Sequence, residues 1–111
     1  MLEVNETMIS LTKGDTAHLS VEITNSPSGE AYTILADDVV ILTIKKQAYE
    51  TAPIMLQKKV VGSGNIALAP EDTAEMAPGN YKYDVELRSG ADVYTVIQCS
   101  EFTLLPEVTT L

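Results

Sequence analysis

Hydrophobic and polar residues alternate most regularly in the segment 78–90, which reads PGNYKYDVELRSG. A period of two is typical of a β-strand with one buried face. A Pro-Gly pair opens the segment and a Ser-Gly pair closes it, and both are typical of turns. The segment therefore predicts one strand with two tyrosines on its buried face. That face would hold Tyr81, Tyr83, Val85 and Leu87, and the opposite face would hold Lys82, Asp84, Glu86 and Arg88.

The rest of the chain predicts further short strands separated by turn residues. These strands are expected at 8–12, 17–24, 32–35, 39–47, 54–61, 66–68 and 92–104, with a loop at 25–29. In the last strand Phe102 is out of phase with Val93 and Ile97, which predicts a bulge near 98–101. Pro70 followed by acidic residues predicts one short helical turn near 70–76.

Seven to nine short antiparallel strands with so little helix are typical of a β-sandwich. A barrel is the alternative, but the turns hold too few glycines to curl every strand. The 111 residues suffice for one two-layer core. We therefore expect residues 1–111 to form a single all-β sandwich domain, with 105–111 as an extended tail. The segment 39–47 is apolar on both faces in its first half, which predicts a central strand.

The net charge of −9 argues against binding to nucleic acid or to an anionic membrane surface, since both require clustered Lys and Arg. The charge is uneven. Residues 39–61 carry four lysines against Glu50 alone, a local charge of +3, and the remaining residues carry three basic and fifteen acidic side chains, a charge of −12. The lysines lie in two pairs around a turn at Pro53, so we expect them at one end of a long hairpin. They form either a solvated surface or one pole of a molecule that stacks head to tail.

Few residues in the chain could support catalysis or metal binding. One histidine, His18, and one cysteine, Cys99, are too few for the usual zinc sites, and they lie far apart in the sequence. The acid pairs at 37–38 and 71–72 lack the pattern of a calcium loop, which favours turn and helix-cap roles. We therefore expect no enzymatic activity and no cofactor or metal. His18 should face solvent, and Cys99 should be a buried, inert thiol.

The two tyrosines of the segment 78–90 predict a structural role. In immunoglobulin-type sandwiches a tyrosine at the corner before the penultimate strand packs inward, and its hydroxyl bonds back to the connection. Tyr81 follows a short acidic turn and a Pro-Gly pair, so it fits this corner. Tyr83 would enter the core on the same face, and its hydroxyl would need a partner. The alternative is that both tyrosines belong to a binding face.

Several segments in a fixed order resemble a known family. They are a lead strand ending in KGDT, then HLSVEI, AYTI, VVILTIKK, IMLQKKV, NIALAPEDTAEMAPGNYKYDVEL and EFTLLPEVT. This order resembles the small immunoglobulin-like β-sandwich domains of phage and prophage structural proteins from Gram-positive bacteria, and is similar to the N-terminal domain of phage upper baseplate proteins. The resemblance spans nearly the whole chain. It implies a virion or assembly component that acts through protein–protein contacts, and it carries over no site residues.

The expected function is therefore that of a non-enzymatic structural protein of a phage or prophage virion, in a tail, baseplate, neck or head decoration. It would be made in the host cytoplasm and located in the virion. Its partners would be other virion proteins or copies of itself in a homo-oligomer, and not nucleic acid or membrane. The alternative is a cell-surface adhesion or carbohydrate-binding module, which would need exposed aromatic side chains. The candidate interaction surface consists of Lys45, Lys46, Lys58, Lys59, Lys82, Asp84, Glu86 and Arg88.

Overall fold

A computed structural model describes residues 2–5, 8–23, 30–49 and 51–108. This part of the chain holds eight β-strands and one short helix. They are β1 (Leu2–Asn5), β2 (Met8–Thr12), β3 (Ala17–Ser20), β4 (Val39–Lys45), β5 (Ile54–Val61), β6 (Asn65–Leu68), α1 (Pro70–Thr73), β7 (Gly79–Ser89) and β8 (Asp92–Leu105). The expected all-β class is confirmed. No helix among these residues is long and apolar enough to cross a membrane.

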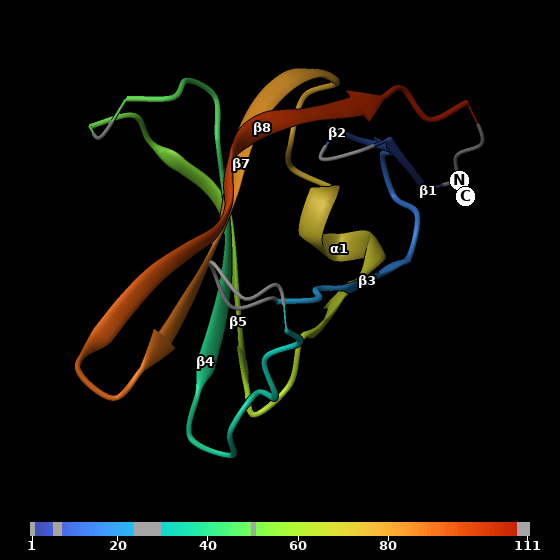
Figure 1. The fold of residues 1–111 in the computed structure, drawn as a ribbon. Helices are drawn as coiled ribbons and strands as arrows, with labels where there is room; N and C mark the ends of the chain where they lie inside the picture. Colours follow the sequence, from blue (N-terminus) through green and yellow to red (C-terminus); the bar gives the residue numbers. More distant parts are fainter. Residues whose placement is uncertain (1, 6–7, 24–29, 50, 109–111) are drawn as a thin grey trace.

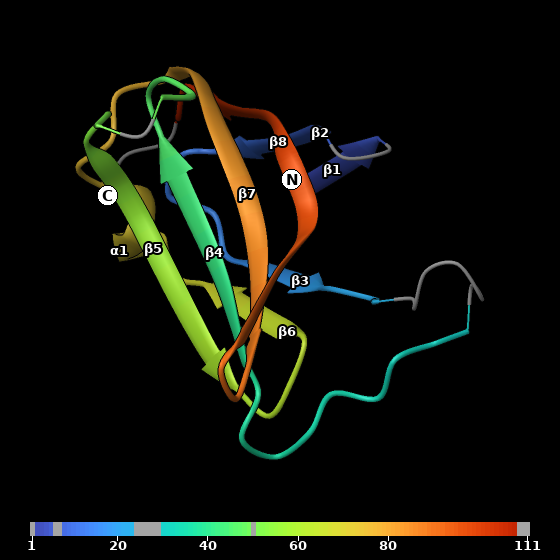
Figure 2. The ribbon, with the colours of Figure 1, turned by 60° about the vertical axis from the view of Figure 1, so that its left-hand side comes forward.

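The strands form two sheets that enclose one core (Figures 1 and 2). The large sheet has the order β1-β2-β8-β7-β4-β5, and the small sheet pairs β3 with β6. The small sheet and α1 lie to one side of the large sheet. Alternation along each strand sends every second side chain between the layers, where burial of apolar area stabilises the fold. The fully buried apolar side chains at the centre are Leu11, Val40, Leu42, Ile44, Ile66, Leu68, Val85, Phe102 and Leu104.

The expectation of antiparallel strands throughout is wrong for one pair. β2 runs parallel to β8, with Ile9 opposite Phe102 and Leu11 opposite Leu104. After β2 the chain crosses to the small sheet, so no hairpin links β2 with β8. The alternation of apolar residues specifies which face of a strand is buried, and it carries no information on strand direction.

The structure also changes several predicted element boundaries. β3 ends at Ser20, and no strand forms at 32–35, although the preceding Ala31 makes an isolated bridge. β1 was not predicted, and the predicted loop at 25–29 lies outside the described residues. The helix is confined to Pro70–Thr73, and β8 continues through Leu105, whose carbonyl accepts a hydrogen bond from the Lys13 N–H. The part of the tail that is described, 106–108, has no regular secondary structure.

A buried carboxylate holds the stretch 32–38 against the sheet. Asp38 is only 2% exposed and accepts hydrogen bonds from the Tyr32 hydroxyl and from the Leu35 N–H at 2.9 Å. The hydrogen bond from Tyr32 is the main reason that the pKa of Asp38 is lowered, and the same bond raises the pKa of Tyr32. The predicted turn role of this acid pair is confirmed, since residues 36–37 form the turn that precedes Asp38.

We expect acid to weaken this connection. Because the pKa of Asp38 is lower in the folded state, its contribution to stability is complete above the unfolded pKa of about 4 and disappears as the pH falls through the folded value. Urea unfolding between pH 7 and pH 2 should show a steeper loss of stability for the wild type than for Tyr32→Phe, which cannot donate to Asp38. Equal pH profiles of the two proteins would contradict this assignment.

Candidate interaction surface

The two tyrosines predicted to be structural both lie on the core face of β7. Tyr81 is 2% exposed, and its hydroxyl donates a hydrogen bond to the Ala77 carbonyl, four residues upstream. Tyr83 is also buried, and this burial raises the pKa of its phenol. Alternation along β7 places both rings inside, so neither belongs to an exposed binding face.

The side chains facing away from the core on β7 and its neighbours form one continuous surface, here called the outer face. The β4–β7 register pairs Lys45 with Lys82, Thr43 with Asp84, Ile41 with Glu86 and Val39 with Arg88. Lys59 of β5 lies opposite Ile41. The outer face therefore holds six of the eight candidate residues: Lys45, Lys59, Lys82, Asp84, Glu86 and Arg88.

The other two candidate residues, Lys46 and Lys58, leave this surface. The Lys46 Nζ lies 4.6 Å from the centre of the Tyr81 ring, which is a cation–π distance. Lys58 lies opposite Leu42, on the core side, and its Nζ is 2.8 Å from an oxygen of Asp72 in α1. Asp72 also accepts a hydrogen bond from the Ala69 N–H, so its predicted helix-cap role is confirmed. Burial would raise the pKa of Asp72, but these two contacts outweigh it and lower the pKa.

The prediction that the lysine pairs share one end of a hairpin is wrong. Lys45 pairs with Ile54, so the connection occupies 46–53, and the lysines of β5 lie in the middle of that strand. β5 begins directly after Pro53, at Ile54, so its lysines lie four and five residues into the strand. Lys58 and Lys59 point to opposite faces of β5, and Lys46 follows the end of β4, so the four charges are separated.

Charges on the outer face are paired along β7. Lys82 contacts Glu101 of β8 at 3.2 Å, and Arg88 contacts Glu86 at 2.7 Å. The pKa of Asp84 is raised, mainly by partial burial and secondarily by Glu86, while Lys45 opposes the shift. Exposed pairs of this kind contribute at most about 1 kcal/mol each to stability. The outer face is therefore mixed in charge and does not form the basic pole that the sequence suggested.

The apolar residue Ile41 is buried on this same face. It is 8% exposed and lies between Lys59 of β5 and Glu86 of β7 in the strand register. Long charged side chains cover apolar surface with their methylene stems while their charged ends stay in water. The central strand, apolar on both faces, is thus covered by its neighbours within the sheet.

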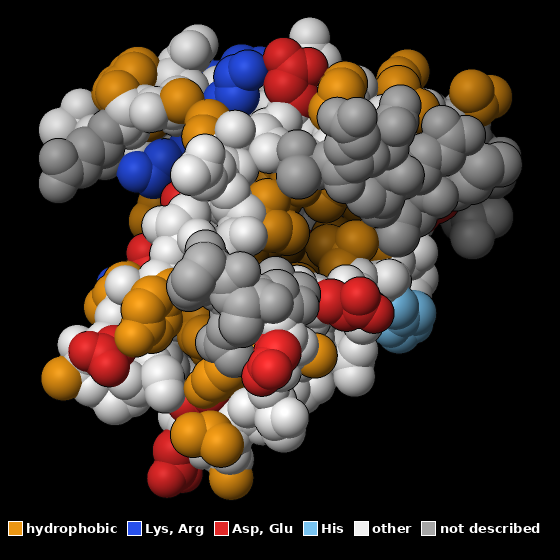
Figure 3. All heavy atoms as spheres, viewed as in Figure 1, with side chains coloured by type: hydrophobic (Ala, Val, Ile, Leu, Met, Phe, Trp, Pro, Cys, Tyr) orange, Lys and Arg blue, Asp and Glu red, His pale blue; other side chains and the backbone are white. Residues whose placement is uncertain are grey.

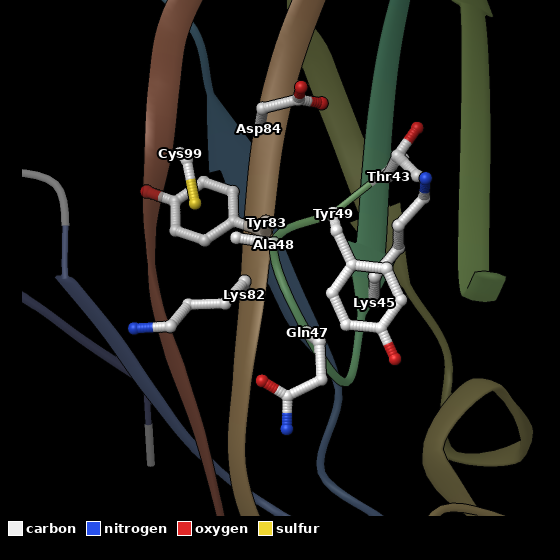
Figure 4. Close-up of a pocket in the computed structure, with 9 residues that line it drawn as sticks. All are labelled: Thr43, Lys45, Gln47, Ala48, Tyr49, Lys82, Tyr83, Asp84 and Cys99. Carbon is white, nitrogen blue, oxygen red and sulfur yellow. The ribbon is translucent and has the colours of Figure 1, made fainter. Parts of the chain in front are cut away.

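A shallow groove of about 320 Å³ opens on the outer face next to the β4–β5 connection (Figure 4). Lys45 and Lys82 lie on its two sides with their ammonium groups pointing away from each other. Tyr49 forms another wall and is 58% exposed, and Cys99 of β8 also lines the groove. The prediction that Cys99 is buried is wrong, because the bulge in β8 turns its thiol outward. Because the two ammonium groups point away from each other, Lys45 and Lys82 do not concentrate positive charge in the groove.

An apolar opening lies between the sheets on another side of the molecule. Its cavity of about 300 Å³ is lined by core side chains that include Leu42, Ile66 and Ile97. Figure 3 shows hydrophobic side chains at the bottom of a hollow in the centre of this view. His18 is exposed on β3, as predicted, and it borders this opening. Among the described residues, no three His, Cys, Asp or Glu side chains are grouped closely enough to hold a metal ion.

Two long stretches of strand edge in the large sheet have no partner strand within the described part of the chain. The first is β5, which pairs only with β4. The second is 92–101 of β8, because β2 covers only Phe102–Leu105. The predicted bulge is confirmed here, as the β7–β8 register shifts between Tyr83 and Val85 and again before Glu86. A free strand edge presents unpaired backbone groups that can pair with another chain.

Comparison with known proteins gives no assignment. No protein-family model matches the chain, and no curated protein sequence matches it.

Proposed function

We propose that the two sheets form an immunoglobulin-like sandwich. In such folds the large sheet contains the strands G, F, C and C′ side by side, and the corresponding neighbours here are β8, β7, β4 and β5. The B and E strands then correspond to β3 and β6. The Tyr81 hydroxyl bonded to Ala77, just before the penultimate strand, has the form of a tyrosine corner.

We further propose that the protein is a non-enzymatic structural component of a phage or prophage virion, which acts through protein–protein contacts. The observation that carries this proposal is the free edge of β8. Both faces of the strand are exposed beside that edge, with Val93 54% and Tyr94 53% exposed. More than half of each of these two side chains is exposed, and exposed apolar surfaces are typical of protein interaction sites. The resemblance in strand order to phage sandwich domains supports the virion as the location.

The test is whether the protein is part of the particle. Particles from the strain that encodes the chain should be purified on a density gradient and analysed by quantitative mass spectrometry. We expect this chain at a constant ratio to the major capsid protein across the particle fractions, with an abundant host enzyme as the negative control. Its absence from the particles, or a position of its gene among metabolic genes, would contradict the proposal.

A carbohydrate-binding module is the second candidate, and Tyr49 favours it. Its exposed ring beside Gln47 and Lys45 provides an apolar face next to polar groups, which is the arrangement that sugars use for stacking and hydrogen bonding. A glycan array should then give micromolar binding that Tyr49→Ala removes and Tyr94→Ala retains. Binding to no glycan would exclude this candidate and leave the structural role in place.

A further inference from the structure

The unpaired edge of β8 lacks two of the features that keep an edge strand from pairing, and its protection is limited to the bulges at the register shifts. Edge strands are commonly protected by lysine or proline. β5 is protected in this way, since it contains Lys58 and Lys59 and follows Pro53. By contrast, residues 93–100 of β8 read VYTVIQCS, eight residues without a charge or a proline. In Figure 1 the hairpin of β7 and β8 projects from the lower left of the molecule.

A second β8 strand could pair with this edge antiparallel around a two-fold axis. Residues directly opposite in such a pair must lie on the same face of the joined sheet. Val93 and Thr95 lie on the outer face, opposite Arg88 and Glu86, whereas Ile97 lies on the core face, opposite Val85. The bulge that follows Ile97 returns Cys99 to the outer face, where it lines the groove beside Lys82 and Asp84.

These positions match in a register whose two-fold axis passes between the two copies of Ile97, and this register pairs the whole stretch 93–101. Val93 of one copy then lies opposite Glu101 of the other, Tyr94 opposite Ser100, and Thr95 opposite Cys99. In each of these three pairs both residues share a face. Tyr94 and Ser100 lie on the core side, opposite Leu87 and Tyr83, and the other two pairs lie on the outer face. A shift by one residue would place outer residues against inner ones.

The same register is complementary in charge. Arg88 is the β7 neighbour of Val93, and Lys82 is the β7 neighbour of Glu101. Four residues then form one row across the joined sheet. Lys82 and Glu101 of one copy are followed by Val93 and Arg88 of the second copy. No two like charges lie directly opposite, an arrangement that would be destabilising. The row occurs twice, once on each side of the axis.

We propose that the partner of the β8 edge is a second copy of this chain, joined through antiparallel β8–β8 pairing centred on Ile97. The pairing makes one continuous sheet from two large sheets and covers the exposed apolar side chains of both hairpins. It deepens and rests on the proposed function, since it identifies self-association as one of the contacts by which the protein assembles. A high local concentration in a particle favours such a modest interface.

The register can be tested with one new cysteine. In Thr95→Cys the new thiol lies opposite the native Cys99 of the second copy, where the separation of directly opposed residues permits a disulfide. Within one chain, positions 95 and 99 are about 13 Å apart along the strand, which is too far to bridge. Oxidation by oxidised glutathione should convert the variant to a covalent dimer. The wild type and Thr95→Cys/Cys99→Ser should remain monomeric on a non-reducing gel.

The edge is tested separately by light scattering of the reduced proteins across a concentration series. The mass of the wild type should rise from 12.0 kDa toward twice that value. Thr95→Lys places a charge on the β8 edge and should weaken the dimer by at least about tenfold, while the matched Val61→Lys on the β5 edge should have no effect. A strictly monomeric wild type, a dimer that Thr95→Cys does not cross-link, or a dimer lost only in Val61→Lys would overturn the inference. Recovery of the chain from particles tests the proposed function independently of these outcomes.

Discussion

Replacement of Tyr81 by alanine should lower the free energy of unfolding by about 3 kcal/mol, because it leaves a cavity where a buried ring was packed. It also removes the donor to the Ala77 carbonyl and the ring beneath the Lys46 ammonium. The melting temperature of so small a domain should fall by more than about 10 °C. Thermal and urea unfolding followed by circular dichroism measure both quantities.

Tyr81→Phe separates the hydroxyl from the ring. This variant keeps the ring and loses only the hydrogen bond, so we expect a loss of about 1 kcal/mol. A Tyr81→Ala protein with an unchanged melting curve would refute the corner role. Equal losses for the two variants would assign the stabilisation to the hydroxyl instead of to the packed ring.

Replacement of Phe102 by alanine should destabilise the domain as strongly, by about 3–5 kcal/mol. Phe102 is fully buried, and in the sheet register it lies between Tyr81 of β7 and Ile9 of β2. Its ring therefore packs where β8 lies between β7 and β2, and its removal disturbs all three strands. Urea titration should show the midpoint move to a lower concentration at nearly constant slope.

Two variants serve as controls for this measurement. Phe102→Leu keeps most of the side-chain volume and should cost clearly less than the alanine variant. Val61→Ala removes methyl groups from an exposed residue of β5, and its effect should stay within about 0.5 kcal/mol. A Phe102→Ala protein as stable as Val61→Ala would show that the core does not depend on this ring.

The sequence was sufficient to predict most of the sheet, because a strand that is buried on one face has alternating apolar and polar residues. The alternation in 78–90 matches the burial of β7, and the phase change after Ile97 matches the register shift in β8. β1 was missed because a four-residue strand is too short to show a clear period. The parallel pairing of β2 was missed because strand direction does not alter the pattern of apolar residues.

The candidate surface was predicted less well, and the lysines show why. Their positions relative to Pro53 suggested one cluster, but the face of each side chain depends on the pairing between Lys45 and Ile54. Cys99 was misplaced for a similar reason, because a bulge changes which residues point outward. The strand edge itself is a property of the sheet order. Only the structure shows that the pairing with β2 begins at Phe102, which leaves this edge of 92–101 without a partner strand among the described residues.

The parallel contact of β2 with β8 has a consequence for the order of folding. Ile9 and Phe102 are about 90 residues apart in the chain, so this contact closes one of the longest loops in the molecule, and its entropic cost is met only after the nearer hairpins have formed. During synthesis β2 must also wait until nearly the whole chain has left the ribosome. Alanine at Leu11 should therefore accelerate unfolding while leaving the refolding rate almost unchanged.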